Sequence, residues 1–86
     1  MATVEERVKA VSAQILKIDP GQIRPESSFT VDLGASSVQS VELVAAFEEE
    51  FDIEMEEDAA LSVETIGKAV EYIAGVCKEQ GVDVEL

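Results

Sequence analysis

Two adjacent serines, Ser36 and Ser37, have the residue type and position that could carry chemistry in this chain. Ser36 and Gln39 fit a capping box at the junction between a loop and a helical pattern, which makes Ser36 the N-cap. Ser37 is then the first helical residue, and its hydroxyl can point into water. A phosphate ester there would face free backbone N–H groups and the positive end of the helix dipole. The site suits a phosphorylated serine, although spacing alone favours the plainer interpretation that both serines only start a helix.

The other reactive residue types form no catalytic or metal-binding set. The chain has no His, the commonest general base and metal ligand, and its one Cys excludes an internal disulfide and a thiolate zinc site. Eight acids crowd residues 48–58, but an EF-hand loop starting at Asp52 would place Glu57 and Val63 where Gly and Glu are required. We therefore predict no catalytic residue and no metal site. The residues interpreted as packing are Phe29, Tyr72 and Cys77.

Three apolar stripes with helical spacing predict three longer helices. They consist of Val4, Val8, Val11 and Ile15; of Leu43, Val44, Phe47 and Phe51; and of Ile66, Val70, Ile73 and Cys77. The first helix is expected over residues 3–17, with Thr3 and Glu6 as a capping box, and the second over residues 37–51. A segment from Glu54 to Leu61 adds a short helix of one or two turns.

A long loop over residues 18–35 separates the first two helices. It contains Asp19-Pro20-Gly21, Pro25 and Gly34 as breakers, and the apolar residues expected to anchor it to the core are Ile18, Ile23, Phe29 and Leu33. No strand alternation or repeat is present. We predict an all-α fold over a single domain, residues 1–86: a small four-helix bundle of three longer helices and one short one. Residues 78–86 are expected to be a frayed tail, with Gly81 as a stop.

The net charge of −13, from 19 acidic and six basic residues, restricts the possible partners. Such a chain repels nucleic-acid backbones and anionic membranes, and it is expected to favour basic protein surfaces. No apolar run approaches ~20 residues, so no membrane span is predicted. The acidic N-terminus lacks the basic and apolar regions of a secretory signal. We expect a cytoplasmic monomer whose small core leaves little room for a buried catalytic apparatus.

Several segments together resemble the acyl carrier protein family. The stretch Asp32-Leu33-Gly34-Ala35-Ser36-Ser37-Val38 is similar to the family's Asp-Leu-Gly-x-Asp-Ser-Leu, whose serine carries 4'-phosphopantetheine. The opening Val4-Glu5-Glu6-Arg7-Val8, the segments Val41-Glu42-Leu43-Val44 and Glu48-Glu49-Glu50-Phe51-Asp52-Ile53-Glu54, and the late Ala69-Val70-Glu71-Tyr72-Ile73 also match. The resemblance runs from about Thr3 to Val76. Its register implies that Ser37 is the attachment residue.

The resemblance implies a carrier rather than an enzyme. A separate Mg²⁺-dependent phosphopantetheinyl transferase would move the arm from coenzyme A to the Ser37 oxygen. The thiol of the arm would hold acyl groups as thioesters for partner enzymes of fatty-acid, lipid or polyketide-type biosynthesis. Ser36 replaces the family's Asp, Val38 replaces its Leu, and Gln39 stands where an acid is usual. These departures favour a carrier dedicated to a specialised pathway.

A partner-docking face is expected on the second helix, opposite its buried stripe. Three small apolar residues lie there among acids, a combination that suits a basic and partly apolar partner surface. The resemblance implies docking of partner enzymes at the matching positions. The predicted docking residues are Val38, Val41, Glu42, Ala45, Glu48 and Glu49.

The alternative interpretation is a non-covalent, acidic protein-interaction module with a carrier-like fold that is never modified. The departures at Ser36 and Val38 favour this alternative. The intact mass of the protein after exposure to a transferase separates the two interpretations.

Overall fold

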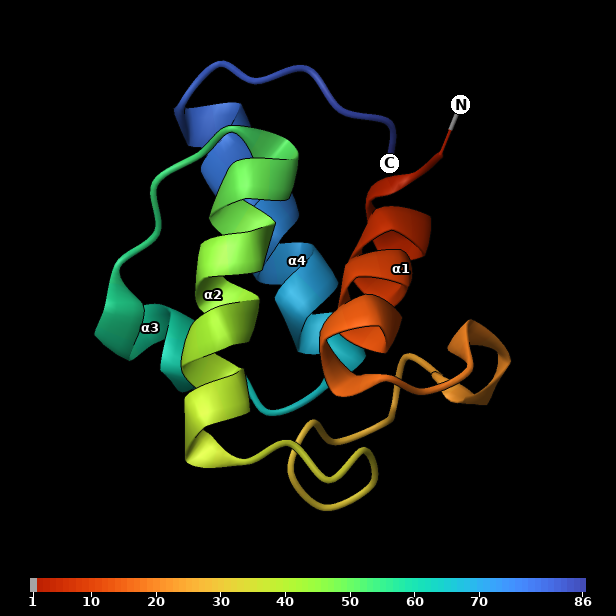
Figure 1. The fold of residues 1–86 in the computed structure, drawn as a ribbon. Coiled ribbons are helices and arrows are strands. Elements are labelled where there is room, and N and C mark those ends of the chain that lie inside the picture. Colours follow the sequence, from red (N-terminus) through yellow and green to blue (C-terminus); the bar gives the residue numbers. More distant parts are fainter. Residues whose placement is uncertain (1) are drawn as a thin grey trace.

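The computed structural model describes residues 2–86, in which α1, α2 and α4 form a bundle and the short α3 lies beside α2 (Figure 1). The elements are α1 (Val4–Leu16), the 3-10 helix η1 (Pro20–Gln22), α2 (Ser37–Phe51), α3 (Glu57–Leu61) and α4 (Ile66–Glu79). Helix α1 packs against both α2 and α4. The prediction of an all-α fold, with a long loop before the second of three longer helices, is confirmed.

Local sequence determines where α1 and α2 begin and end. Thr3 caps α1 as predicted: its hydroxyl accepts the Glu6 N–H at 3.2 Å, and the Glu6 carboxylate accepts the Thr3 N–H at 3.1 Å. Lys17 is the C-cap of α1 and Asp52 is the C-cap of α2, both in the left-handed conformation. Each of these residues directs its N–H to a carbonyl of the last turn, which satisfies a group that the helix end would leave unpaired.

The core lies between the apolar faces of α1, α2 and α4, and it contains most of the predicted stripes. Its buried apolar residues are Val4, Val8, Val11, Ala13, Leu16, Ile23, Phe29, Ala35, Leu43, Phe47, Phe51, Ile53, Ile66, Ala69, Ile73 and Cys77. Ile15, Val44 and Val70, which the spacing placed in these stripes, are only partly buried. Ser12 is fully buried on α1, and its hydroxyl has no hydrogen-bond partner within residues 2–86.

The long loop is ordered by its predicted anchors and by backbone hydrogen bonds to the start of α4. Ile23 and Phe29 are buried, and Ile18 and Leu33 pack against the core, as expected. Gly67 donates its N–H to the Pro25 carbonyl at 2.7 Å, and a Cβ at this position would lie 3.0 Å from the same oxygen. Glycine is therefore favoured here, because a side chain would crowd the Pro25 carbonyl.

The C-terminal segment is not the frayed tail that the sequence predicted from residue 78. Helix α4 continues to Glu79, and the chain then crosses back to the start of α1 (Figure 1). There the Val4 N–H donates to the Glu85 carbonyl at 2.8 Å. Val82 and Val84 pack against the core. The segment is held because its backbone and apolar side chains find partners that are distant in the sequence.

Candidate functional site

The start of α2 has the predicted capping geometry. Ser36 is the N-cap: its hydroxyl accepts the Gln39 N–H at 3.2 Å, and the Gln39 side chain accepts the Ser36 N–H at 3.0 Å. Ser37 follows as the first residue of α2 and is exposed. Its hydroxyl makes no hydrogen bond within the described residues. The cap thus occupies one serine and leaves the other hydroxyl free on the surface.

The loop that leads into α2 is fixed by the carboxylate of Asp32. The Ser28 N–H donates to Asp32 Oδ2 at 2.7 Å, and the Ala35 N–H donates to the Phe29 carbonyl at 2.8 Å. Gly34 has a φ of 71°, a conformation that favours glycine. Sequence reasoning treated Asp32 only as part of a motif, whereas in the structure it orders the turn that positions both serines.

The stretch of chain that contains this site carries acidic residues but no basic ones. Residues 25–67 hold twelve of the 19 acidic residues and none of the six basic ones, so they carry −12 of the net charge of −13. The first turn of α2 itself contains no acid. The free hydroxyl therefore projects from a small neutral patch within a region that attracts cationic surfaces.

The residues predicted for docking fall into two groups. Val38 and Val41 are 71% and 47% exposed, and Glu42, Ala45 and Glu49 are exposed on the same side of α2. Glu48 differs, because it is half-buried and its Oε2 accepts the Met55 N–H at 2.9 Å. Five of the six side chains are thus available to a partner, while the carboxylate of Glu48 is engaged within the fold.

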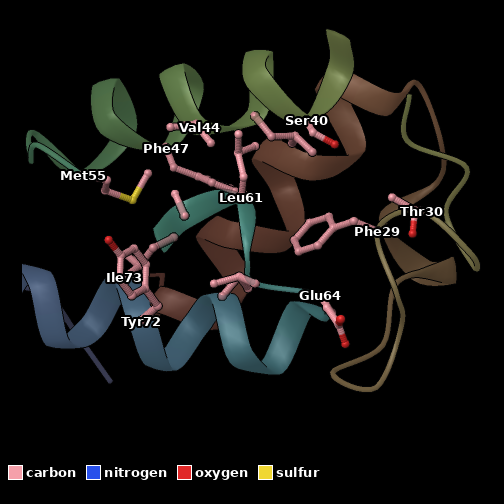
Figure 2. A pocket seen from close by; sticks show the side chains of 14 residues that line it. Phe29, Thr30, Ser40, Val44, Phe47, Met55, Leu61, Glu64, Tyr72 and Ile73 are labelled. Carbon is pink, nitrogen blue, oxygen red and sulfur yellow. The ribbon is translucent and has the colours of Figure 1, made fainter. Parts of the chain in front are cut away.

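A cavity of about 130 Å³ lies between α2, α3 and α4 (Figure 2). Ser40 and Thr30 lie at the end nearest the start of α2, and Met55 and Tyr72 lie at the other end (Figure 2). The lining residues are mostly apolar: Phe29, Thr30, Ser40, Leu43, Val44, Phe47, Met55, Ala60, Leu61, Val63, Glu64, Ala69, Tyr72 and Ile73.

Sequence reasoning did not identify this cavity. It interpreted Phe29 and Tyr72 as packing residues, and both do pack against the core, but they also line the cavity. No sequence signal was available, because the space depends on how the short α3 is seated against α2 and α4. A small internal volume is a property of the packing and not of any local motif.

The remaining reactive groups are structural. Cys77 is fully buried, which confirms its interpretation as a core residue, and burial raises the pKa of its thiol. The side chains of residues 2–86 bring no three potential metal ligands together. Among these residues, no helix has the length and apolar character needed to cross a bilayer.

A family model and several named proteins are similar to this chain over most of its length. A family model described as "Phosphopantetheine attachment site" matches residues 6–73. A protein of Phenylobacterium zucineum (strain HLK1) named "Acyl carrier protein" is 49% identical over 73 residues, which cover 85% of this chain and 92% of that protein. A protein of the same name from Caulobacter vibrioides is 48% identical over 73 residues, covering 85% of this chain and 94% of its own length.

Proposed function

Because this chain belongs to the acyl carrier protein family, we propose that Ser37 is the residue that bears its phosphopantetheine arm. The single observation that supports this choice is the difference in hydrogen bonding between the two serine hydroxyls. The Ser36 hydroxyl is occupied by the helix cap, whereas the Ser37 hydroxyl is exposed and makes no hydrogen bond within residues 2–86. The chain is a carrier and not an enzyme, so the attachment itself is the work of a transferase.

The residues around Ser37 fit a phosphate ester. The backbone N–H groups of Ser37 and Val38 belong to the first turn, where an α-helix offers them no carbonyl partner, and they carry the positive end of the helix dipole. They are suited to stabilise a phosphate on the adjacent oxygen. When attached, the arm supplies a terminal thiol that holds acyl groups as thioesters. The role of this chain is to present the hydroxyl at a fixed, exposed position.

The cavity is the proposed shelter for the apolar end of the acyl cargo. Ser40, three residues after Ser37 and so about one helical turn away, lies at the near edge of the cavity. The volume of about 130 Å³ is close to that of an engineered apolar cavity of about 150 Å³ that binds benzene, so it suits about six carbons. Burial there would remove apolar surface from water at about 0.8 kcal/mol per CH₂ group.

The proposed partners are the phosphopantetheinyl transferase and acyl-transferring or synthase enzymes with basic surfaces. Partners would place apolar groups on Val38, Val41 and Ala45 and basic groups near Glu42 and Glu49. Glu48 lies on the same face of α2. Its carboxylate is bonded within the fold, so we expect it to attract basic partners by its negative charge more than by direct contact. In this proposal the chain acts as a monomer in the cytoplasm.

The attachment site is tested by intact mass. Wild type, Ser36→Ala and Ser37→Ala are incubated with coenzyme A and a broad-specificity phosphopantetheinyl transferase. We expect wild type and Ser36→Ala to gain one phosphopantetheine mass and Ser37→Ala to gain none. Modification of Ser37→Ala but not of Ser36→Ala would overturn the assignment. If wild type remains unmodified with several transferases, the non-covalent interaction module becomes the better interpretation.

A further inference from the structure

Gln80 links the end of α4 to the segment that precedes α3. Its side-chain amide makes two hydrogen bonds with the backbone of Glu54: Gln80 Nε2 donates to the Glu54 carbonyl at 2.6 Å, and the Glu54 N–H donates to Gln80 Oε1 at 3.0 Å. Gln80 lies beyond residues 6–73, the part of the chain that the family model matches. The pairing joins two segments that are 26 positions apart in the sequence.

The segment held by Gln80 forms one end of the cavity. Ile53 is buried and donates its N–H to the Glu48 carbonyl at 3.1 Å, and the Met55 N–H donates to Glu48 Oε2 at 2.9 Å. The Met55 side chain lines the cavity at the end away from the start of α2 (Figure 2). Glu48 holds this wall from α2, and Gln80 holds it from α4.

The next element of the cavity wall is much less firmly held. Helix α3 has five residues, none of them buried, and Glu56 at its N-cap makes no side-chain capping bond. Ala60 and Leu61 of α3 nevertheless line the cavity. Because α3 provides little restraint of its own, the position of this side of the cavity depends on the segment 53–55 that leads into it.

We propose that Gln80 is a positioning residue for the cargo cavity. It holds segment 53–55, whose Met55 forms one wall of the cavity, and so sets the acyl-chain lengths that the carrier shelters. This inference rests on the proposed use of the cavity for cargo. With the wall fixed, the cavity closes around about six carbons and longer chains do not fit. With the wall released, the cavity becomes more variable in size and discriminates less between lengths.

The test compares chain lengths on the full-length, modified protein. Wild type, Gln80→Ala and Gln80→Glu are loaded with butyryl, hexanoyl, octanoyl and decanoyl groups, and thioester cleavage by hydroxylamine is measured. For wild type we expect slower cleavage of hexanoyl than of decanoyl. Gln80→Ala should reduce this ratio about 2-fold to 10-fold, the range for one net hydrogen bond. Gln80→Glu keeps the acceptor but places a carboxylate oxygen against the Glu54 carbonyl, and it should reduce the ratio at least as much as Gln80→Ala does.

Two further measurements separate positioning from general loss of stability. Arg7→Ala serves as the control, because Arg7 bonds to Glu50 and neither residue lines the cavity. It should lower the melting temperature and leave the chain-length ratio unchanged. In the unmodified protein, hydrogen exchange at the Glu54 amide should accelerate in Gln80→Ala and not in Arg7→Ala.

The chain-length experiment distinguishes failure of the Gln80 proposal from failure of the proposal that the cavity shelters the cargo. If wild type protects no chain length better than free acyl-pantetheine does, the cavity is not the cargo shelter and both proposals fail. If wild type discriminates between lengths and Gln80→Ala discriminates equally, only the role of Gln80 fails. The same conclusion follows if Arg7→Ala reduces the ratio as much as Gln80→Ala does.

Discussion

Residues 25–67 and the rest of the chain differ in their balance of acidic and basic residues. The region 25–67 carries −12 with no basic residue, whereas the remainder carries seven acids and six bases, close to balance. The two ion pairs found within residues 2–86 both use cations of α1: Arg7 with Glu50 at 2.9 Å and Lys9 with Glu5 at 3.1 Å. Uncompensated charge is thus concentrated in the part of the chain that contains the free serine and the exposed valines, and eight of its twelve acids lie in residues 48–58. Apart from Glu50, which pairs with Arg7, no acid of residues 25–67 takes part in these two ion pairs, so their charge can attract basic partners.

Residues of α1 make contacts with both the α2 end and the C-terminal segment. Arg7 donates to both the side chain and the backbone carbonyl of Glu50, and its guanidinium lies 4.3 Å from the centroid of the Phe51 ring. The C-terminal segment adds the hydrogen bond from Val4 to Glu85. The contacts of Arg7 thus join the two regions, because Glu50 and Phe51 belong to residues 25–67.

The largest effect is expected from breaking the connection at Arg7. Arg7→Ala removes two hydrogen bonds to Glu50 and the cation–π contact with Phe51, and we expect a loss of about 2 kcal/mol in the free energy of unfolding. Urea denaturation measures this change in the free energy of unfolding. Lys9→Ala is the matched control, because its pair with Glu5 is an i,i+4 surface pair worth about 0.3–0.5 kcal/mol. Equal losses in both variants would contradict the special role of Arg7.

Salt should stabilise the fold, because repulsion within residues 25–67 has no internal compensation. We expect a gain of about 1–2 kcal/mol between low salt and 1 M NaCl, where the Debye length falls to about 3 Å, with a rise in melting temperature of several degrees. MgCl₂ or CaCl₂ at matched ionic strength should raise it further by bridging neighbouring carboxylates. A melting temperature that stays flat or falls with salt would show that local pairing already balances the repulsion.

Ser12 offers a smaller gain on the balanced side. Its buried hydroxyl has no partner within residues 2–86, so Ser12→Ala should remove a desolvation cost and raise the free energy of unfolding by about 1 kcal/mol. Ser62→Ala is the control, because the exposed Ser62 hydroxyl donates to the Asp58 carbonyl at 2.8 Å and its removal should give no gain. A loss of stability in Ser12→Ala would indicate that the hydroxyl makes a favourable interaction.

The smallest effect is expected at the neutral patch beside Ser37. Ser36→Asp keeps an equally good N-cap and adds a negative charge where a basic transferase would approach. We expect modification by a housekeeping transferase to become about 2-fold to 3-fold faster, as for one exposed charge pair, and more sensitive to salt. Stability should change little. An unchanged rate across a salt series would show that this position is not read by the transferase.

The predictions from sequence were accurate where the relevant physics is local. Both capping boxes, the start of α2 at Ser37 and the burial of Cys77 follow from residue types within a turn of each other or from helical spacing. The short helix was placed within residues 54–61, but it begins only at Glu57. Its start was imprecise because the preceding residues are held by Gln80 and Glu48, which lie elsewhere in the sequence.

The sequence by itself determined the helices, the free serine and the excess of acid in residues 25–67, since periodicity, capping and charge need no knowledge of the fold. Tertiary structure alone decided the cavity, the inward carboxylate of Glu48 and the order of the C-terminal segment. The physical reason is separation along the chain. The Arg7–Glu50 contact spans 43 positions and the Gln80–Glu54 pair spans 26, so no local pattern encodes either. Such contacts exist only after helix packing has brought their elements together.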